Sequence, residues 1–141
     1  MEIEENLLKM YYNFIKDKSL FGEKTLIVPK TPQSFSSFPT IVFKESNNSD
    51  YFKGKTTNRQ EFINRLTYIV DIYTKDTIVN GTKYNSLEVL KELKLLTYEF
   101  FNKLGFNRLS SSRAEFMDIT VDRNVSIFEG KVNNWNGKII L

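Results

Sequence analysis

The segment from Leu66 to Asp76, LTYIVDIYTKD, constrains the fold more than any other part of the chain. Its even-numbered residues are apolar as far as position 72, which is the alternation of a β-strand with one face in a core. The opposite face also carries Ile69 and Tyr73, on either side of Asp71. A strand that is apolar on both sides must pack on both sides. We therefore expect the second face either to meet another surface or to form a pocket around a catalytic carboxylate.

Two other segments have the periodicity of amphipathic helices. Residues 2–18 begin with glutamates and end with lysines, an order that complements the helix dipole. The second helix is expected to begin after Asn85, because Glu88 completes the spacing of a capping box, and to end before Gly105. The predicted apolar faces are Ile3, Leu7, Met10, Tyr11, Phe14 and Ile15 in the first helix, and Leu87, Val89, Leu90, Leu93, Leu96, Phe100, Phe101 and Leu104 in the second.

The rest of the chain is typical of strands and turns. We expect strands over residues 25–28, 40–45 and 62–74, with a mobile loop over 46–60. After the second helix, Asn136-Gly137 predicts a hairpin turn into a last strand over 138–141. Before it we expect a strand with Met117, Ile119, Val121, Val125 and Ile127 in the core and Asp118, Thr120, Asp122, Asn124 and Ser126 in water.

This order of elements, close to αβββαβββ, predicts the fold class. Strands grouped around packed helices indicate a single α+β domain with an antiparallel or mixed sheet. A chain of 141 residues is long enough to bury a core of its own. The first helix and the longer second helix are expected to pack on that sheet.

The composition excludes several classes of catalytic and metal site. The chain has neither cysteine nor histidine, which excludes disulfides, thiolate or imidazole metal sites and imidazole-based triads. Two carboxylate pairs remain, Asp71 with Asp76 and Asp118 with Asp122. A solvated strand face explains Asp118 and Asp122 better, and an interface contact or a salt bridge explains Asp71 better. We expect no enzymatic activity, no metal and no cofactor.

Charge and hydropathy narrow the possible partners. The 20 Lys and Arg are offset by 17 Asp and Glu, and the net charge of +3 is too small to indicate nucleic-acid binding. The chain opens with glutamates, and no apolar run approaches the length of a membrane span. We expect a soluble protein of a cytoplasm with no membrane partner.

One short stretch combines basic and aromatic residues. Lys53, Lys55 and Arg59 follow Tyr51 and Phe52 in the polar segment after the second predicted strand. A solvated flexible loop is the simpler interpretation. The alternative is a loop that faces a partner or a DNA conduit.

A second set of residues is typical of a subunit interface. Arg123 lies in the apolar phase of its predicted strand, so we expect it either to reach solvent at the sheet edge or to pair with a carboxylate, in this subunit or the next. The chain is also rich in aromatic residues, and excess apolar surface is typical of association. Our candidate interface residues are Ile69, Asp71, Tyr73 and Arg123. A helix of the same chain on that second face is the alternative.

Four segments together resemble one known family. They are FPTIVFKESNN at 38–48, LTYIVDIYTKD at 66–76, LGF at 104–106 and ITVDRNVSIFEGKV at 119–132. In order and spacing they are similar to the tail-terminator or tail-completion proteins of long-tailed bacteriophages, which include minor capsid proteins of phages from Gram-positive hosts. The NGTKYN turn and the closing NWNGKIIL hairpin depart from that pattern.

The resemblance implies a virion structural protein rather than an enzyme. Its subunits would form a homohexameric ring that ends tail-tube polymerisation in the phage neck, after assembly in the host cytoplasm. The implied partners are further copies of the chain, the tail tube protein and a head-completion or connector protein, with DNA only passing through the lumen. The alternatives are a head-completion stopper, a small phage protein that inhibits a host target, and an enzyme that uses carboxylates alone.

Overall fold

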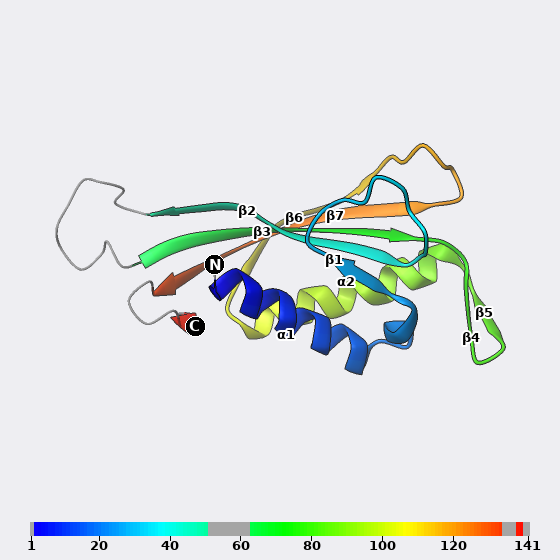
Figure 1. The fold of residues 1–141 in the computed structure, drawn as a ribbon, viewed down its shortest axis with the longest axis horizontal. Coiled ribbons are helices and arrows are strands. Elements are labelled where there is room, and N and C mark those ends of the chain that lie inside the picture. Colours follow the sequence, from blue (N-terminus) through cyan, green and yellow to red (C-terminus); the bar gives the residue numbers. More distant parts are fainter. Residues whose placement is uncertain (1, 51–62, 134–137, 140–141) are drawn as a thin grey trace.

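Two helices lie on one face of a six-stranded mixed sheet (Figure 1). The computed structural model describes residues 2–50, 63–133 and 138–139. The expected α+β fold is confirmed. The helices are α1 (Glu2–Lys18) and α2 (Ser86–Lys103), and the main strands are β1 (Leu26–Val28), β2 (Thr40–Asp50), β3 (Ile63–Thr74), β6 (Asn107–Ala114) and β7 (Asp122–Asn133).

The sheet has the strand order β1-β2-β3-β7-β6. Only the short β1 runs parallel to its neighbour, and all other pairs are antiparallel. The expected last strand is present as β8 (Lys138–Ile139), which pairs with the end of β7. Its predicted turn at Asn136-Gly137 lies outside the described residues.

The start and end of α2 agree with the sequence prediction. The Asn85 side chain accepts from the Glu88 amide, and the Glu88 side chain accepts from the Asn85 amide, so the capping box is complete. After the last turn, Gly105 takes φ 80°, a conformation that glycine adopts without strain. Leu93 and Phe101 are fully buried, whereas Leu87 in the first turn is 54% exposed, so its predicted place on the apolar face is wrong.

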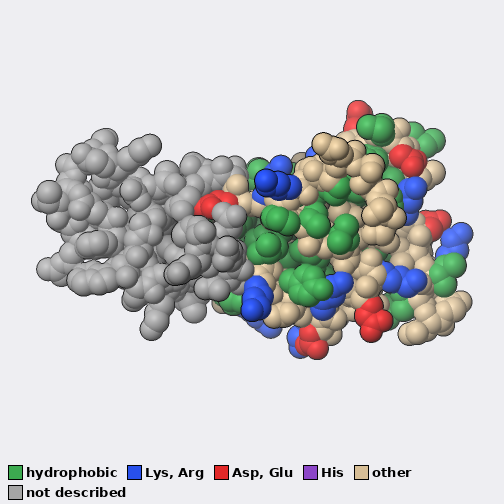
Figure 2. All heavy atoms as spheres, in the orientation of Figure 1, with side chains coloured by type: hydrophobic (Ala, Val, Ile, Leu, Met, Phe, Trp, Pro, Cys, Tyr) green, Lys and Arg blue, Asp and Glu red, His purple; other side chains and the backbone are tan. Residues whose placement is uncertain are grey.

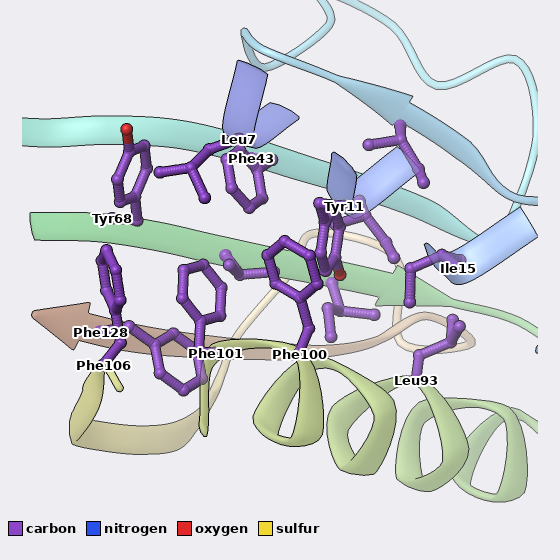
Figure 3. Packing of buried hydrophobic residues seen from close by; sticks show 14 of the residues in the cluster. Leu7, Tyr11, Ile15, Phe43, Tyr68, Leu93, Phe100, Phe101, Phe106 and Phe128 are labelled. Atoms are coloured by element: carbon purple, nitrogen blue, oxygen red, sulfur yellow. The ribbon is translucent and has the colours of Figure 1, made fainter. Parts of the chain in front are cut away.

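The core lies between the helices and the sheet. Leu7, Tyr11 and Ile15 of α1 are buried as predicted, whereas Met10 lies at the outer border of that stripe and is exposed. Figure 3 shows how aromatic side chains from α1, α2 and the strands meet in this layer. Phe101 is at their centre, and its ring packs against those of Tyr11, Phe43, Tyr68, Phe100, Phe106 and Phe128. A layer of this kind supplies most of the hydrophobic stabilisation of a small domain.

Two predictions about strand limits need correction. The strand expected to end at Glu45 continues as β2 to Asp50, so residues 46–50 belong to the sheet and not to a loop. Polar residues can extend this strand because main-chain pairing with β3 resumes after a bulge between Glu45 and Asn47. The expected turn after β3 also contains a small hairpin of β4 (Thr77–Val79) and β5 (Thr82–Tyr84).

The predicted core face of β7 is also wrong. Met117 and Ile119 precede the strand and are 93% and 96% exposed. Within β7, the buried Asn124, Ser126 and Phe128 lie on the helix side, while Val125 and Ile127 lie on the second face. The polar pair tolerates burial because Ser111 of β6 joins it in a hydrogen-bonded group, with O···O distances of 3.0–3.1 Å.

Candidate assembly surface

The second face of the sheet carries the four candidate interface residues. In the strand register Tyr73 lies beside Arg123, and Ile69 lies beside Ile127. β3 and β7 are adjacent and antiparallel, so side chains separated by about 50 residues in sequence meet on this face. The structure therefore brings Asp71, Tyr73 and Arg123 together, two register positions away from Ile69.

The expectation that Arg123 pairs with a carboxylate is confirmed within the chain. Its Nε and Nη2 donate to the two oxygens of Asp71 at 2.9 and 2.7 Å, a two-pronged pair of fixed geometry. Tyr73 donates its hydroxyl proton to Asp71 Oδ2 at 2.8 Å, and the Arg123 guanidinium lies 5.0 Å from the centre of the Tyr73 ring. Asp71 thus has both a cation and a phenol as partners.

Burial and charge raise the pKa of two members of this cluster, Tyr73 and Arg123. The pKa of Tyr73 is raised, first by burial and then by the Asp71 carboxylate, so its phenol stays protonated. The pKa of Arg123 is raised, first because its side chain donates to Asp71. A permanent cation, a carboxylate and a neutral phenol form a structural ion pair.

Two loops of the same chain cover this cluster. Phe35 and Phe38 come from the segment between β1 and β2, and Phe116 comes from the segment between β6 and β7. Their rings lie within 4.6–5.6 Å of one another or of Tyr73, measured between ring centroids. They form a second small core, whose buried members are Val42, Tyr73 and Val121. Loops, rather than the helix that we considered, close this end of the second face.

The four candidates therefore differ in accessibility. Asp71 and Tyr73 are only 4% and 3% exposed, so within one subunit they stabilise the fold and present no contact surface. The Arg123 side chain is 28% exposed. Ile69 is half-buried, beside Val125 and Ile127 on the middle of the same face.

The middle of the second face carries apolar side chains that the described helices and loops leave open. In the described part of the chain both helices lie on the opposite side of the sheet (Figure 1), and the covering loops reach only the Tyr73 end. Ile69, Val125 and Ile127 form a half-buried aliphatic patch between Lys44 on β2 and Glu129 on β7. We call these three residues the aliphatic patch. A patch of this type, bordered by charges, is typical of a protein contact.

The two proposed carboxylate pairs do not form. Asp76 lies 3.6 Å from Lys83 and accepts from the Ser86 amide, while Asp71 is held by Arg123. Asp118 pairs with Lys75 at 3.3 Å, and Asp122 pairs with Arg113 at 3.1 Å. Each of the four carboxylates therefore has its own cation, and for Asp71 this agrees with the salt-bridge interpretation.

Other predicted site features can be placed only in part. Lys53, Lys55 and Arg59 lie outside the described residues. Over the ranges 2–50, 63–133 and 138–139, there is no group of three or more acidic residues that could hold a metal. Neither described helix is long and apolar enough to cross a membrane.

Two surface features were not found from the sequence. One is the exposed tip of the segment between β6 and β7, where Met117 and Ile119 were predicted to be core residues. The other is a hollow of about 330 Å³ lined by residues of α2 and Arg108. The exposed Leu95 and Tyr98 on α2, outside its predicted apolar face, were the available signal for this hollow.

The chain was compared with known proteins by sequence. No protein-family model matches it, and no curated protein matches it.

Proposed function

We propose that this protein is a subunit of a ring that caps the tail tube of a long-tailed phage and joins the tail to the neck. Three of the four segments that carry the resemblance correspond to β2, β3 and β7. These three strands are neighbours in the sheet, so the resembling residues form one continuous structural unit. A shared fold would keep such a central unit while turns and terminal strands vary.

The observation that carries the proposal is the aliphatic patch on this unit. Ile69 and Ile127 form a cross-strand pair that already helps the sheet of one subunit, and contact with a neighbouring subunit would bury the rest of this aliphatic surface. In a ring, one surface of each subunit meets a different surface of the next. The patch of Ile69, Val125 and Ile127 is suited to one side of such a contact.

The sheet edges support the same arrangement. β6 forms one edge with eight residues, and β2 has no outer neighbour beyond Val42 among the described residues. Two different open edges on one subunit are compatible with head-to-tail association and do not require a two-fold axis. In the proposed ring, they would lie near the subunit boundaries.

A head-completion stopper is the second candidate, because it would need the same ring symmetry. The two roles differ in partner, since a terminator binds the tail tube and a stopper binds the portal side of the neck. An inhibitor of a host protein would need neither partner. Binding to purified tubes therefore separates the three functions.

The test is polymerisation of tail tube protein in the presence of this chain. We expect tubes to stop growing and to carry the protein at one end in electron micrographs. A double variant Ile69→Lys/Ile127→Lys should lose this capping, while Ile78→Lys, on the β4–β5 hairpin, should retain it. Tubes of unchanged length with no bound protein would reject the terminator function, and binding to portal complexes instead would favour the stopper.

A further inference from the structure

A basic hollow lies on the outer side of α2. It is lined by Lys91, Lys94, Leu95, Tyr98 and Arg108 and has a volume of about 330 Å³. That volume is near the lower end of the range of binding pockets, roughly 300–1,000 Å³, so it suits a few side chains. The guanidinium of Arg108 lies 4.7 Å from the centre of the Tyr98 ring. Among the described residues, none of the three cations has an ion pair.

Two large apolar side chains line this basic hollow together with its cations. Leu95 is 59% exposed and Tyr98 is 39% exposed, although both are large side chains on a helix that has a well-filled core face. Exposed apolar groups bordered by unpaired cations indicate a partner that is itself apolar and acidic.

The chain carries a segment of that chemistry between β6 and β7. We call residues 115–120, EFMDIT, the acidic tip. Met117 and Ile119 on it are 93% and 96% exposed, more than any other large hydrophobic residue that the structure describes. Glu115 is exposed and has no ion pair among the described residues. Figure 2 shows hydrophobic and acidic side chains at the upper right, where Figure 1 places this segment.

The acidic tip is held in place from within the subunit. Asp118 accepts from the amide and hydroxyl of Thr120 at 2.9 and 2.7 Å and pairs with Lys75. At the base of the tip, Arg123 donates to the Glu115 carbonyl oxygen at 3.2 Å. A segment fixed in this way loses little conformational entropy on binding, so its exposed side chains are preorganised for a contact.

We infer that the acidic tip of one subunit docks into the basic hollow of the next. Met117 and Ile119 would contact Leu95 and Tyr98, and Glu115 would lie against the lysines of the hollow. This inference rests on the proposed function, because it supplies the head-to-tail contact that a ring needs.

The hollow and the tip of one subunit cannot meet each other. Arg108 is near the start of β6 and the tip follows its end, so most of an extended strand, roughly 20 Å, separates them. Figure 1 shows the tip at the far end of β6 from the C-terminal end of α2. The tip is also anchored on both sides by paired strands, β6 and β7. Docking must therefore be between subunits.

A nucleic acid fits this hollow less well than an acidic protein segment. Tyr98 and the cations could receive a base and a phosphate, but Leu95 offers only an aliphatic contact. Glu88 and Glu99 on the same helix flank Lys91 and Lys94 in sequence and would repel a phosphate backbone that continued along α2.

The test is the mass of three purified proteins by light scattering over a concentration series. One is the wild type, one is the tip variant Met117→Ser/Ile119→Ser, and one is the hollow variant Lys91→Glu/Lys94→Glu. All changed residues lie at the surface or are half-buried, so circular dichroism should confirm folded proteins. We expect each variant to weaken self-association by about tenfold or more. The matched controls Leu20→Ser/Ile78→Ser and Lys9→Glu/Lys24→Glu should associate like the wild type.

Mixing the two variants gives the sharper result. The tip variant keeps an intact hollow and the hollow variant keeps an intact tip, so a 1:1 mixture should form pairs that cannot grow further. Adding Glu115→Lys to the hollow variant should restore part of its self-association. Single-stranded DNA bound tightly to the wild type, but not to the hollow variant, would instead assign the hollow to nucleic acid and overturn the inference.

The outcomes separate this contact from the ring itself. If both variants form assemblies of the same mass as the wild type in solution, the contact between tip and hollow is overturned and the ring proposal still stands. A different outcome is that the two variants form pairs in the mixture, but the wild type forms no closed rings and does not cap tubes. That outcome would support the contact and reject the proposed function. A wild type that stays monomeric at every concentration would overturn the contact.

Discussion

The two faces of the sheet are closed in different ways. On one face, α1 and α2 cover the strands with a continuous layer of side chains such as Tyr11, Leu93 and Phe101, all fully buried. On the other face, loops and the Asp71–Arg123 pair close only the end near Tyr73, and the aliphatic patch is left half-buried. The first face therefore accounts for the folding of one subunit, whereas the second keeps half-buried aliphatic side chains that neither the helices nor the described loops cover.

The largest effect should come from the helix-covered face. Leu93→Ala removes a fully buried side chain from α2 and should lower the free energy of unfolding by about 2–5 kcal/mol. The matched control is Leu95→Ala on the same helix, which is 59% exposed and should cost about 0.5 kcal/mol or less. Urea unfolding of both variants measures the difference. Equal losses would show that the core does not lie beneath α2.

An intermediate effect should come from the loop-covered end of the second face. Arg123→Met leaves the Asp71 carboxylate buried without its cation, and we expect a loss of roughly 1–3 kcal/mol in the free energy of unfolding. Arg113→Met is the control, since its side chain is 72% exposed in its pair with Asp122 and should contribute about 0–1 kcal/mol.

The same pair allows a check of coupling. Asp71→Leu/Arg123→Met removes both charges together and should be more stable than Arg123→Met alone. If the double variant loses as much free energy of unfolding as Asp71→Leu and Arg123→Met lose together, the two side chains do not act as a pair.

A smaller effect, visible only at alkaline pH, compares one buried tyrosine from each face. Burial raises the pKa of both Tyr11 and Tyr73 above the usual value near 10. Since the unfolded chain releases the phenol protons first, this contribution to stability is complete below about pH 10 and is lost as the pH rises further.

We expect the free energy of unfolding to fall by up to about 1.4 kcal/mol per pH unit for each such tyrosine above pH 10. Urea unfolding between pH 8 and 11 tests this. Tyr11→Phe and Tyr73→Phe should each reduce the slope by a similar amount. A slope unchanged in both variants would mean that neither phenol is protected from ionisation.

The sequence was most informative where periodicity and local chemistry agreed. Asn85, Glu88 and Gly105 defined both ends of α2, because capping depends on residues only a few positions apart. The alternation of β3 likewise predicted its helix-covered side. What one strand alone could not predict was which side of β7 would face the helices.

The errors in β7 have a physical explanation. Asn124 and Ser126 are buried because Ser111, on a different strand, completes their hydrogen bonds, and such a partner is not visible in local alternation. Met117 and Ile119 continue the alternation of apolar residues along the sequence, but they precede β7 and lie on an exposed tip. The candidate site was recovered in part, since a carboxylate partner for Arg123 was expected, but the sequence left open whether that carboxylate would come from the same subunit.

A ring requires self-association, and the most direct measurement of it is the solution mass of the wild-type protein by light scattering across a concentration series. A mass near six subunits, or a monomer that converts to that mass on concentration, is the result that the proposal predicts. A strict monomer at every concentration would contradict it, and the aliphatic patch would then need an explanation other than ring assembly.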